Sequence, residues 1–287
     1  MKLSEEMKNK TLLSFELFPP KTEKGLQNLP GTIDHLMKYN PSYISCTYGA
    51  GGGNVGANRE VCQMIKNAGT TPVTHFTVIK NTKEGIKEQL DQYLADGVDH
   101  MLALRGDIPL GETTTCGDFD YATDLVKFVR DTYGDKFEIA VAGSPEGHIS
   151  CRSLESDIAV LKQKQDNGAD YIMTQLCWDM EQFKYWLDAI RKAGITMPVD
   201  VGVMPILDQA ATINMALSRN GCVMDSELCR LISRNWLFPN PFNAKDADGK
   251  PFDMFYEDKV KRFKEEGIEY TIRQIDEYRA LGCLLYT

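Results

Sequence analysis

Short apolar runs alternate with amphipathic stretches along almost the whole chain. The apolar runs are rich in β-branched residues and occupy residues 12–17, 43–47, 71–77, 100–104, 138–142, 171–174, 199–203 and 284–286. Several of them are apolar at nearly every position, which is typical of parallel strands covered on both faces. The pattern therefore predicts eight buried strands.

The stretches between these runs have helical spacing. In the stretch that begins at Asn81, one face would carry four apolar residues, Ile86, Leu90, Tyr93 and Leu94. Asn81 with Glu84 three residues later resembles a capping signal. A second helix is predicted over residues 153–167, with Gly168 ending it, and a last helix over residues 257–280.

Strands that alternate with helices predict a parallel sheet, either open and doubly wound or closed into a barrel. Eight strands favour an α/β fold of the (βα)8 TIM barrel type, and 287 residues suit one such catalytic domain over residues 1–287. Residues 235–255 hold three prolines and interrupt the alternation of predicted strands and helices, so we expect an irregular excursion there. The sequence stops at Thr287 on the eighth strand, so either the barrel lacks its final helix or the sequence is shortened.

Composition narrows the classes of function. The apolar runs are far too short to span a membrane, and the first eleven residues lack the apolar core of a secretory signal, so we expect a cytoplasmic protein without a membrane partner. A net charge of -9 argues against a nucleic-acid surface. The eight cysteines are scattered without a CxxC pair, so we expect packed thiols and no metal site.

Polar residues gather where the predicted strands end. In TIM barrels this carboxyl end carries the active site. The residues there are Glu16, Thr47, His75, Thr77, the run Arg105-Gly106-Asp107, the segment 144–148 and Gln175. This arrangement predicts an active site at one end of the barrel.

Each of these residues also has a structural interpretation. Glu16 stands among apolar neighbours, so its carboxylate is either paired or kept for proton chemistry. Arg105 and Asp107 could form an ion pair that closes a loop, or could approach a ligand through the backbone at Gly106. A histidine such as His75 in an apolar strand is more often a core residue with satisfied hydrogen bonds. The glycine-rich run 49–53 lacks the spacing of the common phosphate loops.

Several segments together resemble the methylenetetrahydrofolate reductase family. FELFPPKT, SCTYGAGG, HFT, ALRGD, DYATDLV, AGSPEGH, Lys164 followed by NGAD, and MTQ occur in that family's order. The resemblance covers residues from about 13 to 203 and returns in the last helix and in the closing LLYT. It implies a catalytic-domain-only enzyme of the bacterial type.

The resemblance implies a flavin-dependent oxidoreductase of one-carbon metabolism and methionine biosynthesis. NADH or NADPH would reduce bound FAD, and the flavin would pass hydride to 5,10-methylenetetrahydrofolate, giving 5-methyltetrahydrofolate. Glu16 would deliver the proton that opens the methylene bridge, and Asp107 would stabilise the resulting cation. Gln175 would hydrogen-bond the pterin or the nicotinamide. Small-molecule substrates, a homo-oligomer and a redox partner subunit are the partners implied.

The resemblance also implies a set of FAD-binding residues. They are Thr47, His75, Leu104, Arg105, Gly106, Asp107, Tyr121, Ala122, Ser144, His148, Asp157 and Lys164. Arg105, Lys164 and His148 would supply the local positive charge that an acidic protein needs to hold a pyrophosphate. Without the resemblance, Lys164 would be interpreted as a solvated helix lysine.

Three departures from the family pattern keep alternatives open. Ser144 replaces an aromatic residue that contacts the flavin, Gln209 stands where relatives place an aromatic that stacks on substrate, and the sequence ends before the final helix. The first alternative is a flavin- or folate-binding subunit of a larger redox complex with little activity of its own. The second is another FAD barrel, such as a proline dehydrogenase-like oxidase. Trp236, Leu237 and Phe238 in the excursion would suit a subunit contact or would pack over the barrel floor.

Overall fold

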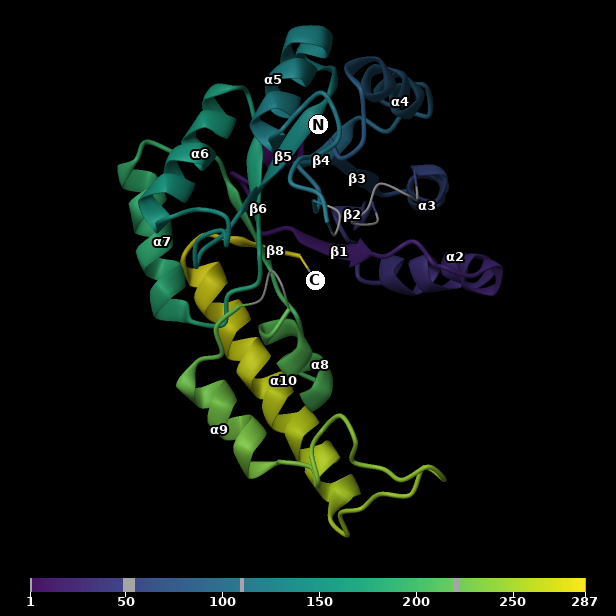
Figure 1. Ribbon diagram of the computed structural model, residues 1–287, viewed down its shortest axis with the longest axis vertical. Coiled ribbons are helices and arrows are strands. Elements are labelled where there is room, and N and C mark those ends of the chain that lie inside the picture. The colour runs from purple at the N-terminus through teal and green to yellow at the C-terminus, as the bar shows by residue number, and fades with distance from the viewer. Residues whose placement is uncertain (1, 49–54, 109–110, 219–221, 287) are drawn as a thin grey trace.

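A computed structural model of the protein describes residues 2–48, 55–108, 111–218 and 222–286. Eight parallel strands form a closed barrel in sequential order (Figure 1). They are β1 (Leu13–Leu17), β2 (Tyr43–Cys46), β3 (Thr71–Thr77), β4 (His100–Leu104), β5 (Glu138–Gly143), β6 (Tyr171–Thr174), β7 (Val199–Gly202) and β8 (Leu284–Tyr286). The predicted (βα)8 barrel is confirmed, and every predicted strand lies within one residue of its observed bounds.

Helices cover the outside of the barrel, close its amino end or project away from it. They are α1 (Leu3–Glu6), α2 (Glu23–Met37), α3 (Val55–Asn67), α4 (Lys83–Ala95), α5 (Ala122–Tyr133), the 3₁₀ turn η1 (Gly134–Lys136), α6 (Leu154–Asp166), α7 (Met180–Lys192), α8 (Gln209–Ala216), α9 (Ser226–Arg234) and α10 (Tyr256–Ala280). Among the described residues, no helix has both the length and the apolar character that crossing a membrane requires.

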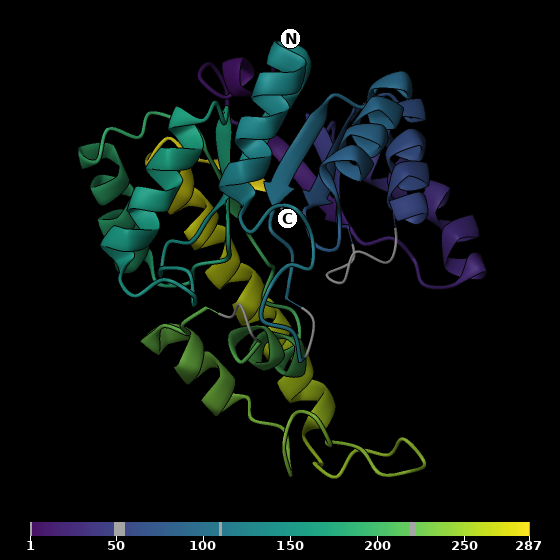
Figure 2. The ribbon, with the colours of Figure 1, turned by 45° about the horizontal axis from the view of Figure 1, so that its top comes forward.

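The connection between β7 and β8 leaves the barrel as a projecting arm. We define the arm as α8, α9, α10 and the segment 235–255, which extend away from the barrel in both ribbon views (Figures 1 and 2). Its own apolar cluster includes Ile213, Leu231 and Phe263. The sequence pattern predicted only α10 of these three helices.

Two local predictions for helix ends had different outcomes. Asn81 is not the cap of α4, because the side-chain oxygen of Thr82 accepts from the Gly85 amide at 3.1 Å. Asn81 instead donates to the carbonyl of Thr77 at 3.2 Å. For α6 the prediction is confirmed: Ser153 caps the helix, and Gly168 follows it at φ 101°, where a side chain would be strained.

Apolar side chains form one layer between strands and helices and another inside the barrel. The outer layer includes Ile44, Phe76 and Val141. The inner layer includes Leu102 and Met173, and α1 contributes to it from the amino end of the barrel. This alternation along each strand leaves inward positions near the carboxyl ends available for polar residues.

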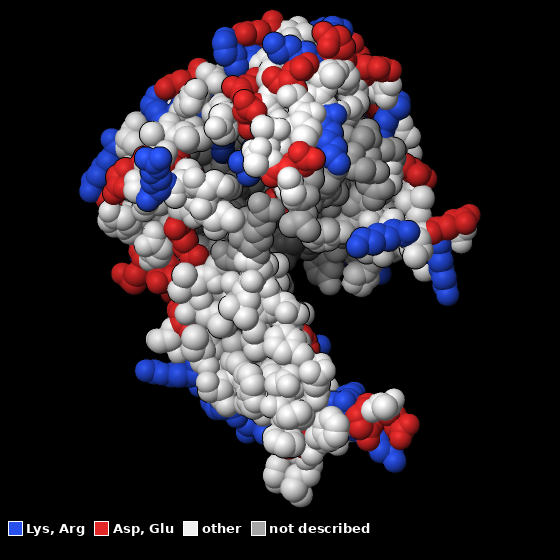
Figure 3. All heavy atoms as spheres, viewed as in Figure 1, with Lys and Arg blue, Asp and Glu red and all other residues white. Residues whose placement is uncertain are grey.

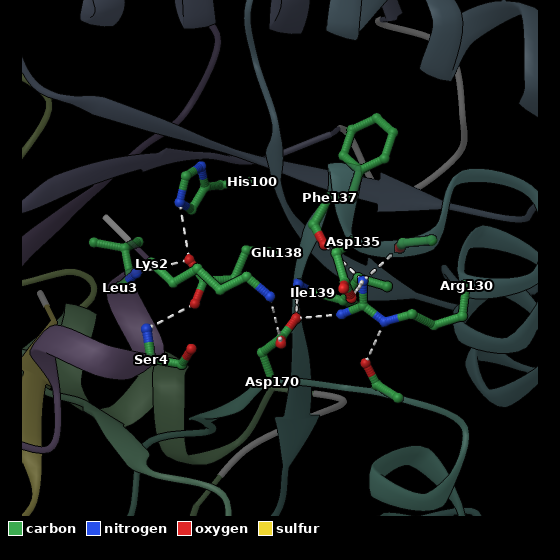
Figure 4. A network of polar contacts seen from close by, with 12 residues as sticks. Lys2, Leu3, Ser4, His100, Arg130, Asp135, Phe137, Glu138, Ile139 and Asp170 are labelled. Carbon is green, nitrogen blue, oxygen red and sulfur yellow. Dashed lines mark hydrogen bonds and ion pairs between the residues drawn. The ribbon is translucent and has the colours of Figure 1, made fainter.

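Helix α1 closes the amino end of the barrel (Figure 4). The Glu138 carboxylate accepts from the backbone amides of Leu3 and Ser4, both at 2.7 Å, and lies 2.9 Å from His100 Nε2. Amides at a helix start have no partner within the helix, so this buried carboxylate supplies one. Burial alone would raise the pKa of Glu138, but hydrogen bonds from His100 and Ser4 hold it below its usual value.

An arginine joins the neighbouring loops at this end (Figure 4). Arg130 donates to the carbonyls of Gly168 at 2.7 Å and Phe137 at 2.8 Å, and it pairs with Asp170. Asp170 also accepts from the Ile139 amide at 2.8 Å. The floor of the barrel is therefore a continuous polar network that uses none of the predicted site residues.

The segment 235–255 contains no helix and lies at the start of α10, far from the barrel floor (Figure 1). Lys259 donates to the carbonyl of Trp236 at 2.9 Å. Leu237 is buried, whereas Trp236 and Phe238 are 42% and 61% exposed. The suggestion that these residues pack over the barrel floor is therefore wrong.

Candidate active site

Glu16 and His75 meet inside the carboxyl end of the barrel. They extend from β1 and β3, and Glu16 Oε2 lies 3.4 Å from His75 Nε2. Burial raises the pKa of Glu16 to about 7 and lowers the pKa of His75 to about 4. At neutral pH the imidazole is therefore uncharged, and Glu16 is close to half protonated. Such a carboxyl can either give or accept a proton.

The polar atoms beside this pair are available to a ligand. His75 Nε2 is buried beside Glu16 Oε2 at 3.4 Å, and Thr77 Oγ1 is buried without a hydrogen-bond partner within the described ranges. His75 therefore faces Glu16 inside the barrel, and its role in binding FAD stays a prediction. Buried polar atoms normally have partners, so an unpaired hydroxyl beside the Glu16–His75 pair indicates a place for a bound group.

The loop after β4 lies against the end of β3. Thr77 pairs with Leu104, and the run Arg105-Gly106-Asp107 follows directly. Gly106 has φ 86°, and a Cβ there would lie 3.1 Å from the Thr77 Cβ, so only glycine fits without strain. Arg105 Nε donates to the Gly106 carbonyl at 3.3 Å, and within the described part of the chain no ion pair joins Arg105 to Asp107. Both charged groups therefore remain available to a ligand.

A second group of predicted residues surrounds the start of α6. The backbone amide of His148 donates to Asp157 at 3.1 Å, and Lys164 Nζ donates to the Ala142 carbonyl at 2.9 Å. Burial lowers the pKa of Lys164, so this lysine is not the solvated residue that its helical position alone indicates.

His148 connects this group electrostatically with the loop after β4. Burial lowers the pKa of His148; Asp157 opposes this shift, Arg105 and Lys164 reinforce it, and Asp107 opposes it. These five side chains therefore lie within electrostatic range of one another. They combine two fixed cations, two carboxylates and one titratable ring at the carboxyl end of the barrel.

Three further predicted residues directly follow strands. The Thr47 amide donates to the Leu17 carbonyl at 2.9 Å, and the Gln175 amide donates to the Gly143 carbonyl at 2.8 Å. The Ser144 carbonyl accepts from the Gly147 amide at 2.9 Å. The backbone at each position is therefore fixed by its neighbours at the carboxyl ends of the strands.

The remaining residues named from the sequence do not contact Glu16 or His148 in the described structure. Tyr121, which is 61% exposed, and Ala122 stand at the start of α5. Within the described residues, neither makes a hydrogen bond or ion pair with Glu16 or His148. Gln209 is 2% exposed and donates to the Asn235 carbonyl at 2.6 Å, so its side chain joins the start of α8 to the end of α9. The glycine-rich run 49–53 lies outside the described residues.

Sequence reasoning missed a polar group deeper in the barrel. Tyr43 donates to the Asp200 carboxylate, and both residues are fully buried. Burial raises the pKa of Asp200 to about 7, although the hydrogen bond from Tyr43 opposes the shift. A carboxylate between two valines, as in Val199-Asp200-Val201, was the signal available, and it resembles the environment that drew attention to Glu16.

All eight cysteines are free thiols. Within the residues that the structure describes, no three His, Cys, Asp or Glu side chains are arranged to hold a metal ion. The candidate site is therefore built from carboxyl, imidazole, guanidinium, ammonium and amide groups.

Comparisons with known proteins identify the family of the chain. The methylenetetrahydrofolate reductase family model matches residues 2–227. Methylenetetrahydrofolate reductase (NADH) 1 of Arabidopsis thaliana is 38% identical over 219 residues, which cover 72% of this chain and 37% of that protein. The 5,10-methylenetetrahydrofolate reductase of Escherichia coli is 34% identical over 202 residues, which cover 70% of this chain and 67% of that protein. The match thus spans little more than a third of the plant relative.

Solved structures support the fold. An uncharacterized protein from Clostridium thermocellum, described as binding two copies of 5-methyl-5,6,7,8-tetrahydrofolic acid, has a TM-score of 0.60 and 13% sequence identity. The likeness covers 99% of this chain and 91% of that one, and at this identity it supports the barrel architecture alone. The stronger evidence is the family match over residues 2–227 together with the 34% identity to the bacterial relative. This chain therefore belongs to the methylenetetrahydrofolate reductase family.

Proposed function

We propose that the protein reduces 5,10-methylenetetrahydrofolate to 5-methyltetrahydrofolate by hydride transfer through FAD. The observation that carries the proposal is Glu16, a carboxyl with a pKa of about 7 held inside the carboxyl end of the barrel. The reaction requires a proton at N10 of the folate, and an acid with this pKa is suited to deliver it at neutral pH. Family membership supports the same substrate class.

The residues present fit a flavin dinucleotide. The unpartnered Thr77 Oγ1 and the His75 imidazole offer hydrogen bonds, and Arg105 with Lys164 offers positive charge for a pyrophosphate. Asp157 suits a ribose hydroxyl. When bound, FAD would supply hydride transfer between a nicotinamide and the folate, and the name of the plant relative, an NADH-type reductase, favours NADH as the nicotinamide.

Side chains of the protein would supply the proton, stabilise the positive charge and orient the ligands. Glu16 would hold the proton for the departing N10. Asp107, which has no ion pair to Arg105, would stabilise the positive charge that develops as the methylene bridge opens. Gln175 would orient the pterin or the nicotinamide by hydrogen bonding, since its backbone is fixed at the end of β6. We also propose that the protein is a homo-oligomer.

The test is the visible absorption spectrum of the purified protein, recorded without air before and after addition of 5-methyltetrahydrofolate. We expect a flavin band that the folate bleaches. Glu16→Gln should slow the bleaching by about 100-fold or more, in line with the usual contribution of a general acid, and should leave the flavin band in place. Glu23→Gln, an exposed change on α2, is the matched control and should bleach like the wild type.

Other outcomes separate the alternatives. A flavin band that the folate leaves unchanged would favour a binding subunit of a larger redox complex, a role that the loss of an aromatic at Ser144 would suit. Bleaching by an amino acid instead would favour another type of flavin oxidase. A protein that binds no FAD when FAD is in excess would refute the proposed function.

A further inference from the structure

Helix α10 runs from the arm to the barrel and carries a row of buried polar side chains in its second half (Figure 1). Tyr270, Gln274 and Tyr278 are spaced four residues apart, so they lie along one side of the helix. All three are buried. Buried polar groups need hydrogen-bond partners, and all three of these side chains reach the loop after β6.

That loop consists of residues 175–179 and joins β6 to α7. The Tyr278 hydroxyl donates to the Cys177 carbonyl. Gln274 Nε2 donates to the Trp178 carbonyl at 2.7 Å. Cys177 and Trp178 are themselves buried, so a carbonyl that lost its donor here would have no water to replace it.

Tyr270 holds the Gln274 amide in place. Gln274 Nε2 also donates to the Tyr270 hydroxyl at 3.0 Å. That hydroxyl lies 3.1 Å from Asp225 Oδ2 and 3.3 Å from the Trp178 carbonyl oxygen. A phenol has one hydrogen to donate, and a carboxylate is the stronger acceptor, so Tyr270 donates to Asp225. The Gln274 amide is thereby oriented toward the Trp178 carbonyl.

The same loop orients the side chain of Gln175. The Leu176 backbone amide donates to Gln175 Oε1 at 2.9 Å. The direction of this side chain therefore depends on the peptide unit that joins the two residues. Cys177 is the next residue, so the bond from Tyr278 to its carbonyl limits how far that peptide unit can rotate. A continuous series of contacts thus connects α10 with Gln175.

Apolar contacts bind this loop to the arm as well. Trp178 belongs to the arm's apolar cluster together with Ile206, and Leu176 packs against that cluster. Helix α10 also holds the loop after β7, because the Ile206 amide donates to Thr271 Oγ1 at 3.1 Å. The arm therefore supports two neighbouring loops at the carboxyl end of the barrel.

We propose that Tyr278 and Gln274 are positioning residues that orient Gln175 and thereby set the affinity of the site for the folate. The inference rests on the proposed function, in which Gln175 hydrogen-bonds the pterin or the nicotinamide. Both residues act through the loop backbone, because their bonds end on the carbonyls of Cys177 and Trp178. Without either bond the peptide units after Gln175 rotate more freely, so its side chain spends less time in the binding orientation.

The first test examines the loop and does not depend on turnover. Tyr278→Phe keeps the ring and removes the donor to Cys177. We expect hydrogen–deuterium exchange of the Leu176 amide, followed by NMR, to become about fivefold faster, because one hydrogen bond shifts a local opening equilibrium by about that factor. Tyr133→Phe on α5 is the matched control, since the Tyr133 hydroxyl donates to Asp91 on α4 at 2.8 Å. In this control, exchange at Leu176 should equal that of the wild type.

The second test is a double-mutant cycle on flavin bleaching by 5-methyltetrahydrofolate. Tyr278→Phe should raise the folate concentration that gives half the limiting rate about fivefold, while the dissociation constant for FAD stays unchanged. Gln175→Leu should raise the same concentration. Because Tyr278 acts through Gln175, the combined variant should match Gln175→Leu within about twofold, whereas two independent losses would multiply.

A second variant keeps the question open to decision if Tyr278→Phe does not fold. Gln274→Met removes the donor to the Trp178 carbonyl and keeps a side chain of similar length. It should also speed exchange at Leu176 and raise the folate concentration for half the limiting rate. In the Gln175→Leu background, its effect on that concentration should disappear.

The outcomes separate two failures. Wild-type exchange at Leu176 in both α10 variants, or independent effects in the cycle, would overturn the positioning role. Faster exchange in a protein whose flavin the folate never bleaches would instead refute the proposed function, and with it the effect on folate affinity. Faster exchange together with a non-additive cycle supports both.

Discussion

At the scale of single residues, the environment decides which ionisable groups can act. Glu16 was recognisable from the sequence because apolar neighbours surround it, and the structure raises its pKa to about 7 by burial. Asp200 has similar neighbours and a similar pKa, but it belongs to none of the family motifs. For Lys164 the sequence and the structure differ. Its helical position indicates a solvated lysine, whereas its ammonium group reaches the end of β5 and donates to the Ala142 carbonyl.

Lys164 therefore gives a prediction about flavin affinity. We expect Lys164→Met to raise the dissociation constant for FAD by about tenfold, because a partly buried ammonium that contacts a pyrophosphate contributes a charge-assisted hydrogen bond. Lys162→Met is the matched control on the same helix, since Lys162 pairs with Asp166 and does not reach β5. Fluorescence titration with FAD measures both constants. Equal constants for the two variants would show that Lys164 does not contact the flavin.

At the scale of elements, the short helix α1 depends on a strand far along the chain. Glu138 on β5 accepts the amides of Leu3 and Ser4, and His100 on β4 completes the group. Burial alone would lower the pKa of His100, but the hydrogen bonds that its ring donates to Asp99 and Glu138 raise it to about 9. The protonated imidazole thus stabilises the folded barrel floor.

This floor predicts a pH dependence of stability. Because the pKa of His100 is raised on folding from 6.5 to about 9, its contribution is complete below pH 6.5 and is lost as the pH rises through 9. We expect the free energy of unfolding to fall by about 2 kcal/mol between pH 7 and 9.5. Urea denaturation across this range measures the fall. His100→Gln should abolish the slope and His35→Gln, an exposed change on α2, should preserve it; a slope that survives in His100→Gln would contradict the assignment.

At the scale of the whole molecule, the arm departs most from a plain barrel. The face of the arm turned toward the viewer in Figure 3 carries few Lys, Arg, Asp or Glu side chains. Phe238, Met254 and Phe255 are 61%, 87% and 56% exposed. Exposed apolar patches of this kind often mark contacts between proteins.

The arm therefore gives a prediction about assembly. We expect the protein to be a homo-oligomer whose subunit contact includes the segment 235–255. Replacing Phe238 and Phe255 together by Ser should shift the protein to a smaller species in sedimentation velocity, because the contact loses two large apolar side chains. Tyr185→Ser, on the barrel surface and 59% exposed in the wild type, should leave the mass unchanged. A wild-type monomer, or a double variant with wild-type mass, would refute the prediction.

The sequence by itself determined the barrel, because strand and helix periodicities are local and each strand of a parallel barrel is buried along most of its length. It also placed Glu16, His75 and Arg105 at strand ends, since strand boundaries are encoded in the same local pattern. Only the tertiary structure decided which side chains meet. The pairs Tyr43–Asp200 and Leu3–Glu138 are separated by 157 and 135 positions. Their contact depends on the register of strands around the closed barrel, which no local pattern records.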